Sequence, residues 1–423
     1  MHRQSGKIRN ELVAEGILPH DSWHNWEFAT FDCECLMAEV GDGFSGGVKF
    51  VHRLTSIAIK TSFGEPGEYY LERQDMDPWS VKILVQDFLL TLMQIRRDMF
   101  NQLPQSVIDG RTRYRNITKS KDFKKRPVER QANAWAKLRF LDKCLALRIY
   151  SWNGERYDHN VLWAPLLDVF AGMDDTLQKL SIIRRGTGIM QFTDEALIFR
   201  DFLNMTSPMK IEKFAQSCGV EGVSKTTFPY EYYRTIESLR LATAFPPYES
   251  FRSSLCQDKS LFMAELETVV TENIRNGKWT DAAEANKVFG FDPPIEFSSS
   301  DGKYSISQAD HRHALEILHT SPKKYFESKE IFDRECSTMA DYLKHYNLND
   351  VILLVRCIKA YAAGFFRSWQ VNIHEQMSLP GVAQYLAFRY YDEKETAIYT
   401  FGKSFKTYND QIRQQLHGGM TLA

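Results

Sequence analysis

Two carboxylates stand two positions apart near the start of the chain, in the stretch FATFDCECLM at 28–37. Side chains alternate between the faces of an extended strand, so Asp32 and Glu34 share one face while Phe31 and two cysteines share the other. Oxygen ligands on one face suit a hard divalent cation such as Mg²⁺ or Mn²⁺. A solvated acidic face is the simpler interpretation, because acid-x-acid pairs arise by chance in a chain with 54 acidic residues. The pair therefore indicates a metal site only if partner residues exist.

Two further carboxylates occur where a metal ligand can be held. Asp158, in SWNGERYDHNVLW, lies where a predicted strand gives way to a helix, which is where ligands bind in open α/β sheets. Helix capping explains this aspartate equally well. Asp350, in YNLNDVILL, follows Tyr346 by four residues, so an acid and a phenol project from one helix face. An incidental polar stripe on a surface helix is the alternative. His345 competes with the tyrosine, but its five-residue spacing rotates it off that face.

Composition describes a globular chain without a strong overall charge. Of its 423 residues, 43% are hydrophobic and 25% are charged, so it can bury a substantial core in two or three structural units. A formal net charge of −1 implies no global attraction to nucleic acid or membrane, so a site for a polyanion requires local clustering. Seven scattered cysteines, with neither an apolar leader nor a run of membrane-spanning length, predict an intracellular protein that is neither secreted nor membrane-inserted.

The order of predicted elements favours an α/β fold. Antiparallel strands are expected first, then an amphipathic helix, another strand and a strand pair. The predicted ranges are 28–37, 50–63 and 69–75 for the first strands, 78–102 for the helix, 145–153 for the next strand and 181–202 for the pair. Strand-strand-strand-helix-strand-helix is the order of a ribonuclease H-like core. We therefore expect a mixed sheet flanked by helices, followed by a mainly helical C-terminal part with its strongest helix in 335–369.

Two stretches interrupt this order. Between Arg111 and Arg130 the chain holds nine Lys or Arg against two acids. This basic stretch either binds a phosphate backbone, with Tyr114 and Phe123 stacking on bases, or forms a solvated insertion loop. Proline-containing segments bracket an irregular region at 255–292, which we interpret as an insertion or an extra helix.

The ordered motifs resemble the proofreading exonuclease domain of family B DNA polymerases, in particular the protein-primed-like branch of viruses, linear plasmids and self-synthesising transposons. FDCE is similar to the first exonuclease motif, D-x-E; NGERYD to the second, in which an asparagine precedes an aromatic residue and Asp; and YNLND to the third, Y-x-x-x-D. The segments LIFRDFLNMTSPMKIEKFAQ, SKTTFPYEYY and MSLPGVAQYLAFRYY are spaced as in that branch. The resemblance runs from about residue 28 to 423, with gaps at the two interrupting stretches.

This resemblance implies a two-metal 3′→5′ exonuclease that acts on the single-stranded 3′ end of DNA. It implies two Mg²⁺ or Mn²⁺ ions held by four carboxylates, with Tyr346 orienting the attacking water and Lys225 assisting catalysis. It also implies that Asn153, Tyr157 and Tyr230 contact the DNA strand. The implied metal ligands are Asp32, Glu34, Asp158 and Asp350.

One segment departs from the family pattern. The family commonly has a small hydroxyl residue before leucine in a D-S/T-L segment that touches the DNA strand. This chain has Asp201, Phe202 and Leu203 there. That contact is therefore not carried over, whereas the carboxylate set for hydrolysis is intact.

No polymerase palm motif occurs in the chain, and Gly418-Gly419 matches the junction between exonuclease and polymerase in the family. We therefore expect the exonuclease portion of a DNA-directed DNA polymerase, whose partners are DNA and, as in that branch, a terminal priming protein, with no membrane. Two alternatives remain: a free-standing 3′→5′ exonuclease and a non-catalytic DNA-binding remnant. The expected parts are an N-terminal extension at 1–27, the exonuclease domain at 28–370 with insertions near 103–140 and 255–292, and a connection toward an absent polymerase domain at 371–423.

Overall fold

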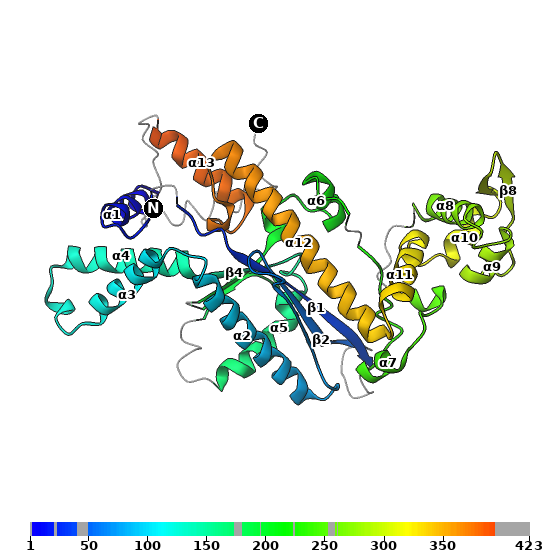
Figure 1. Cartoon of the computed structure of the whole chain (residues 1–423), viewed down its shortest axis with the longest axis horizontal. Helices are drawn as coiled ribbons and strands as arrows, with labels where there is room; N and C mark the ends of the chain where they lie inside the picture. Colours follow the sequence, from blue (N-terminus) through cyan, green and yellow to red (C-terminus); the bar gives the residue numbers. More distant parts are fainter. Residues whose placement is uncertain are drawn as a thin grey trace.

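The computed structural model describes residues 2–20, 23–39, 50–172, 180–194, 196–222, 225–252, 259 and 261–393. A mixed sheet lies at the centre with helices against its faces, a helical hairpin projects at one end, and a second helical unit lies at the other (Figure 1). The predicted α/β architecture with a helical C-terminal part is confirmed at this level. The predicted junction at Gly418-Gly419 lies outside the described residues.

The central sheet has seven strands in the order β3-β2-β1-β4-β7-β6-β5. The strands are β1 (Phe28–Glu39), β2 (Phe50–Thr61), β3 (Glu68–Glu72), β4 (Leu147–Ser151), β5 (Ser181–Arg185), β6 (Gly188–Thr193) and β7 (Leu197–Asp201). β1 pairs antiparallel with β2 and parallel with β4, and β4 pairs parallel with β7. The predicted strand pair in 181–202 is wrong, because three strands form there. Gly186, with a positive φ of 60°, lies in a two-residue turn that joins β5 and β6 into a hairpin, and β7 follows as the third strand.

One face of the sheet is covered by α2 (Pro78–Phe100) and α5 (Asp158–Ala171). The carboxylate of Asp77 caps α2 by accepting hydrogen bonds from the backbone N–H groups of Trp79 and Ser80. Apolar residues recur along α2 at three- and four-residue spacing and pack on the side of β1 that carries Phe31. Burial of this face fixes the register of β1, so Asp32 and Glu34 must point the other way.

The opposite side of β1 and β2 is crossed by the long helix α12 (Met339–Trp369), as predicted for 335–369. Thr338 and Asp341 cap its start reciprocally, each side chain accepting from the backbone N–H of the other. The hydroxyl of Thr30 on β1 donates to the carbonyl of Val351 at 3.0 Å, deep in the interface. This contact sets the part of α12 that carries Asp350 directly over β1.

The basic stretch is not a loop. It belongs to a helical hairpin formed by α3 (Gln105–Lys119), a short 3₁₀ turn η1 (Phe123–Lys125) and α4 (Val128–Leu145). The hairpin packs on α1 (His2–Ala14) through its own apolar core. Tyr114 and Phe123, predicted to stack on bases, are buried in that core. Their predicted role is therefore wrong, since the rings are used to join the helices.

The second interrupting stretch, 255–292, includes two helices, α8 (Phe262–Arg275) and α9 (Ala283–Phe289), rather than one extra helix. Residues of both helices, including Phe289 of α9, pack in an aromatic-rich core with Tyr248 and Tyr325. The same unit contains the two-stranded sheet of β8 (Phe297–Ser300) and β9 (Lys303–Ile306), together with α10 (His311–Ile317) and α11 (Pro322–Glu335).

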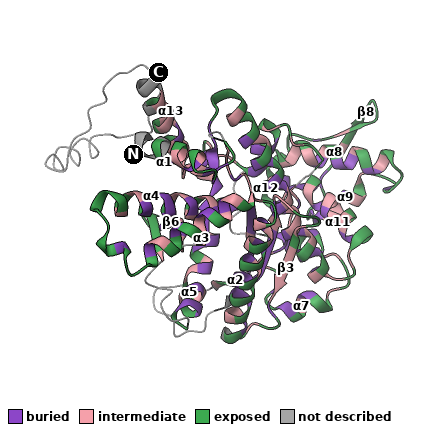
Figure 2. Cartoon of the chain, turned by 60° about the vertical axis from the view of Figure 1, so that its left-hand side comes forward, coloured by how far each residue is buried: buried purple, intermediate pink, exposed green. Residues whose placement is uncertain are grey.

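Six further elements belong to the described chain. They are η3 (Phe202–Met205), α6 (Ile211–Ser217), α7 (Ile236–Leu241), η4 (Tyr248–Phe251), η5 (Ile373–Glu375) and α13 (Leu379–Glu393). Buried residues follow the sheet and the inner sides of the helices, whereas the far end of the α3–α4 hairpin is mostly exposed (Figure 2). Within the described ranges, no helix combines the length and apolarity needed to cross a membrane.

Candidate metal centre

Three carboxylates meet between β1 and α12. Asp32 and Glu34 come from alternate positions of β1, and Asp350 comes from the helix that crosses it, with the ligand atoms of all three within 4.8 Å of one another. Glu34 and Asp350 are each only 6% exposed, and Asp32 is half-buried. Like charges this close in a water-poor site repel strongly, so the arrangement needs a compensating positive charge.

Electrostatics favour the protonated forms of Asp32 and Glu34 when no divalent cation is present, because the pKa of each is raised. Burial, followed by the charge of Asp350, raises the pKa of Asp32 to about 7. Burial and the charge of Asp32 raise the pKa of Glu34 well above its ordinary value. A divalent cation would reverse these shifts by favouring the ionised carboxylates.

One side-chain cation already reaches the cluster. The ammonium of Lys225 lies 2.8 Å from Oδ2 of Asp350. Burial opposes its charge, yet Asp350, Tyr346 and Asp32 together hold the pKa of Lys225 well above its ordinary value. The lysine is therefore charged, and it offsets one of the negative charges of the cluster.

A buried oxygen of the same aspartate lacks a partner. Oδ1 of Asp350 is inaccessible to solvent and has no hydrogen-bond partner among the described residues. A buried acceptor left unsatisfied costs about 1–3 kcal/mol. A cation bound between Asp350, Asp32 and Glu34 would satisfy it, and an all-oxygen donor set fits Mg²⁺ or Mn²⁺.

The fourth predicted ligand, Asp158, lies in the same cavity but outside the group of three. It is the first residue of α5, after Tyr157 at the N-cap position, so the capping alternative is not what is observed. Its Oδ1 accepts a hydrogen bond from the backbone N–H of Cys33 at 3.1 Å. Burial and then the charge of Asp32 raise the pKa of Asp158 well above its ordinary value. Asp158 thus stands beside Asp32, where the two could share a second cation.

Two phenols close the cavity on the α12 side. Tyr346 is buried one turn before Asp350, as the four-residue spacing predicted. Its ring meets that of Tyr230 edge-on, with centroids 6.1 Å apart. Tyr230 also hydrogen-bonds to Glu34, an interaction that partly opposes the raised pKa of this acid. Both phenols therefore lie within the acidic site.

The remaining predicted residues, Asn153 and Tyr157, form the rim of the cavity. Asn153 adopts a left-handed conformation with φ 64°, which asparagine tolerates better than most residues. The carboxylate of Asp201 accepts hydrogen bonds from the backbone N–H groups of Asn153 and Glu155 at 3.0 and 3.1 Å. In the segment that departs from the family pattern, Asp201 therefore fixes the turn that carries the rim.

Several lining residues were not found from the sequence. His52 on β2 lies 3.0 Å from the hydroxyl of Tyr157, and Trp152 and Glu231 complete the wall. A lone histidine in a predicted strand has no spacing signal, so only the register of β1 with β2 brings it to the cavity. His345 is not at this cavity and instead pairs with Glu335 at 3.3 Å.

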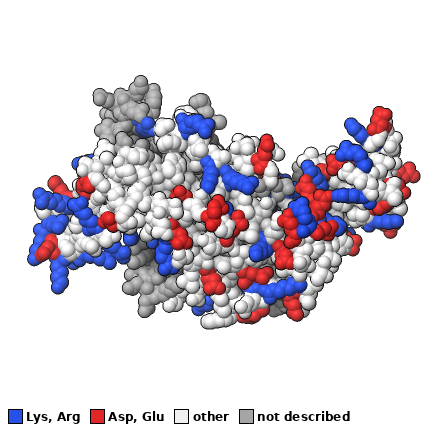
Figure 3. All heavy atoms as spheres, in the orientation of Figure 1, with Lys and Arg blue, Asp and Glu red and all other residues white. Residues whose placement is uncertain are grey.

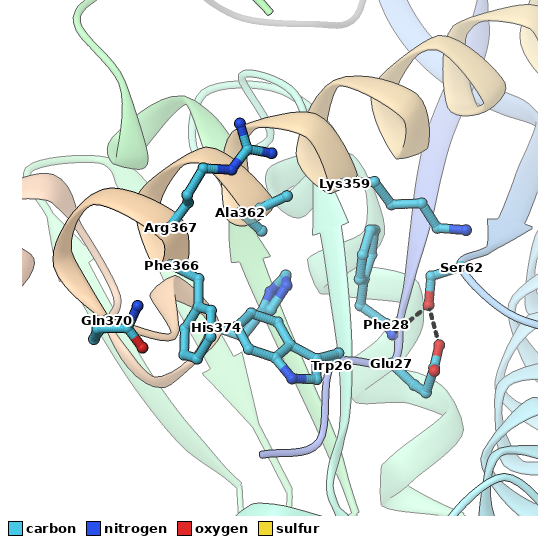
Figure 4. Close-up of a pocket in the computed structure, with 11 residues that line it drawn as sticks. Trp26, Glu27, Phe28, Ser62, Lys359, Ala362, Phe366, Arg367, Gln370 and His374 are labelled. Carbon is cyan, nitrogen blue, oxygen red and sulfur yellow. Dashed lines mark hydrogen bonds between the residues drawn. The ribbon is translucent and has the colours of Figure 1, made fainter. Parts of the chain in front are cut away.

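The acidic cavity has a volume of about 360 Å³, which is within the range of small-ligand sites. A larger hollow of about 690 Å³ lies between the start of β1 and the last turns of α12, with walls that include Trp26, Phe366 and His374 (Figure 4). Its lining carboxylate, Glu27, accepts a hydrogen bond from Ser62 at 2.7 Å. Glu27 is the one carboxylate among the described residues that line this hollow, so it offers no group of acids comparable to that of the smaller cavity.

Comparisons of the chain with protein-family models, with curated proteins and with solved structures find no match. The geometry of the acidic cavity is therefore the basis for assigning a function.

Proposed function

We propose that this chain is a metal-dependent 3′→5′ exonuclease with a ribonuclease H-like core, and that it forms the proofreading portion of a family B DNA-directed DNA polymerase. The observation that carries the proposal is the group of Asp32, Glu34 and Asp350, which includes a buried oxygen of Asp350 without a partner. Burying acidic groups close together and leaving one of their oxygens without a partner costs free energy, which a bound cation would offset.

The strand order supports the proposed core. β1 to β3 are antiparallel neighbours, and β4 and β7 follow on the other side of β1 in parallel. Three antiparallel strands followed by parallel ones fit the order of elements from which we expected a ribonuclease H-like core, and they are the support for this part of the proposal. Two acids lie on the inner strand β1, and Asp158 begins the helix that follows the adjacent strand β4. In open α/β sheets, ligands bind at such strand ends.

Phosphodiester hydrolysis adds negative charge to a group that is already anionic. Divalent cations held by the carboxylates would supply positive charge and lower the pKa of a water nucleophile. Asp32, Glu34 and Asp350 would hold one ion, and Asp32 with Asp158 a second. Lys225 would place its charge close to the scissile phosphate, and the hydroxyl of Tyr346 would orient the water.

The rim of the cavity suits a strand of any sequence. Tyr157 and Trp152 offer aromatic rings, and the side chain of Asn153 is exposed beside them. Stacking on aromatic rings tolerates every base, which an enzyme that removes any terminal nucleotide requires. We assign the single-stranded 3′ end of DNA to this rim.

The direct test is release of nucleotides from 5′-labelled single-stranded DNA by the full chain, with Mg²⁺ or with EDTA. The proposal expects a ladder of products shortened from the 3′ end that requires Mg²⁺ and disappears in the Asp350→Asn variant. Mn²⁺ should replace Mg²⁺, because both ions accept oxygen ligands.

Hydrolysis that persists in EDTA, or in Asp350→Asn at the parental rate, would overturn the proposal. A chain that binds DNA but neither hydrolyses it nor binds Mg²⁺ in a calorimetric titration would instead be the non-catalytic remnant. A natural reading frame without a polymerase domain would favour the free-standing exonuclease.

A further inference from the structure

The α3–α4 hairpin concentrates positive charge far from the acidic cavity. Residues 111–130 carry a formal charge of +7, from nine basic and two acidic residues, in a chain whose total is −1, which leaves −8 for the rest. Figure 3 shows this charge as a group of Lys and Arg at one end of the molecule. We call residues 105–145 the basic hairpin. Such asymmetry is typical of a surface that meets a polyanion.

The charges divide into two groups along the hairpin. Toward α1, cations are neutralised: Arg111 pairs with Asp142 at 2.6 Å, and the buried Lys137 pairs with Glu11 and Glu15. At the tip, a group of exposed cations forms no ion pair within the described part of the chain: Arg115, Lys119, Lys121, Lys124, Arg126 and Arg130. The folded chain pairs the first group with its own carboxylates, whereas the second group is exposed and forms no ion pair within the described residues.

Hydrogen bonds and a buried ring brace the turn at the tip of the hairpin. The side-chain amide of Gln131 donates to the carbonyl oxygens of Lys124 and Arg126 at 3.3 and 2.7 Å. Phe123 is buried between these basic positions and meets the ring of Trp135 edge-on, at 6.1 Å between centroids. The cations of the tip are therefore presented by an ordered turn, which reduces the entropy lost on binding.

An aromatic side chain lies next to this turn. Trp135 is 43% exposed, although it touches Phe123. It lines an open hollow of about 560 Å³ together with Leu138 and Arg139. An accessible indole beside cations is the combination by which proteins hold single-stranded nucleic acid, with a base on the ring and phosphates on the cations.

We propose that the basic hairpin binds a single strand of nucleic acid outside the acidic cavity, with phosphates on the tip cations and a base against Trp135. The choice of nucleic acid as the polyanion rests on the proposed function. An anionic membrane fits less well, because the large exposed apolar side chains of the hairpin are only Val128 and Trp135, too few for an apolar face that enters a bilayer.

The test measures binding of fluorescein-labelled single-stranded DNA to the full chain by anisotropy, over a series of salt concentrations in EDTA. One variant combines Lys121→Gln, Lys124→Gln and Arg126→Gln. The slope of log Kd against log salt concentration should fall by about 2, since each lost phosphate contact on a single strand contributes about 0.7. Trp135→Ala should weaken binding by about 5- to 150-fold, the range for loss of one stacked base, and Trp135→Phe should weaken it less.

A matched control removes equal charge elsewhere, from exposed positions on α8, α9 and β9: Arg275→Gln, Lys287→Gln and Lys303→Gln. It should keep the parental slope within error. Circular dichroism and the urea midpoint check that every variant is folded. A tip variant with the parental slope, or a control variant that loses as much slope as the tip variant, would overturn the proposal.

Two further measurements separate this proposal from its alternatives. Binding of the chain to phosphatidylserine vesicles through the tip cations, without binding to DNA, would overturn it in favour of a membrane surface. Nuclease activity is scored separately with Mg²⁺. A chain that does not hydrolyse DNA but loses binding in the tip variant refutes only the proposed function, whereas a chain that hydrolyses DNA with unchanged tip-variant binding refutes only the hairpin.

Discussion

Replacing Lys225 by methionine tests whether the acidic cluster is built to hold metal. The ammonium of Lys225 lies 2.8 Å from Oδ2 of Asp350, and methionine keeps much of the side-chain volume without the charge. In the variant, three carboxylates whose ligand atoms lie within 4.8 Å of one another face each other without this cation. We therefore expect the metal-free protein to lose stability and to depend more on a divalent cation.

The expected loss of stability depends on how deeply the ion pair of Lys225 and Asp350 is buried. Removal of one partner of a fully buried ion pair costs about 3–5 kcal/mol. The side chain of Lys225 is 33% exposed, so water replaces part of the lost interaction. Uptake of a proton by Asp32, whose pKa burial and Asp350 raise to about 7, relieves more of the repulsion. We expect the free energy of unfolding in EDTA to fall by about 1–2 kcal/mol.

Binding of Mg²⁺ should restore the stability that the charge of Lys225 supplied. A ligand at a hundred times its Kd stabilises the folded state by about 2.7 kcal/mol. The gain should be larger in the variant than in the parental chain, because Lys225 no longer competes for Asp350. Urea unfolding followed by the fluorescence of the eight tryptophans measures both quantities, in EDTA and in Mg²⁺.

A matched control is Lys324→Met. Lys324 lies 2.6 Å from Glu212, its side chain is 36% exposed, and it is not among the residues of the acidic cavity. Its removal should cost a similar or smaller amount of stability that Mg²⁺ does not restore. Failure of Mg²⁺ to stabilise the parental chain, or equal Mg²⁺ responses in the two variants, would refute the assignment of the cluster as a metal centre.

Four further predictions address the site and its surroundings. Asp32→Asn should abolish magnesium-dependent release of 3′ nucleotides and raise the stability of the metal-free protein by about 1 kcal/mol, because it removes a charge that burial and then Asp350 disfavour. Urea unfolding in EDTA that shows a loss of stability would contradict this. Tyr346→Phe should keep Mg²⁺ binding but lower the single-turnover rate about a hundredfold, and an unchanged rate would limit the phenol to packing. The parental chain should add no nucleotide to a primed template, and incorporation by a preparation free of contaminating polymerase would refute the expectation that the chain lacks a polymerase palm. Glu375→Gln should lower the free energy of unfolding by about 2–3 kcal/mol at pH 7. Burial raises the pKa of Glu375, but the hydrogen bond and charge of His24 outweigh this and lower that pKa from 4.5 to about 2. The difference between parental and variant urea midpoints should therefore disappear as the pH falls from about 4.5 toward 2.

The first strand of the central sheet was predictable because the alternation of apolar and polar residues in its sequence matches the alternation of buried and cavity-facing side chains. Phe31 and the cysteines beside it alternate with Asp32 and Glu34, and the apolar set indeed lies in the core under α2 and α5. The spacing of Tyr346 and Asp350 likewise gave the face of α12 that meets β1. Because the spacing of residues in the sequence matched the buried faces of β1 and α12, one strand and one helix were sufficient to predict that three acids meet.

The basic hairpin was not predicted because its buried positions are not a run of large apolar residues. Along α3 the buried residues are Val107, Gly110, Tyr114 and Thr118, which keep helical spacing but include a glycine and a threonine. Gly110 is required there, since a Cβ atom would come within 2.4 Å of Ile17. Close packing of chain segments through small residues leaves little hydrophobic pattern in a sequence dominated by Lys and Arg.

The position of Asp350 on α12 has a consequence for when the acidic cluster first exists. Asp32 and Glu34 are synthesised early, but their third partner lies more than three hundred residues later, and the Thr30–Val351 hydrogen bond that joins the two regions spans 321 positions. A nascent chain on the ribosome, or a proteolytic fragment that ends before α12, therefore contains the sheet without the cluster. Domains that need such distant contacts complete their sites late in folding. Under the proposed function, hydrolysis would begin only after the chain has docked its long helix, so an incomplete chain would not cut nucleic acid.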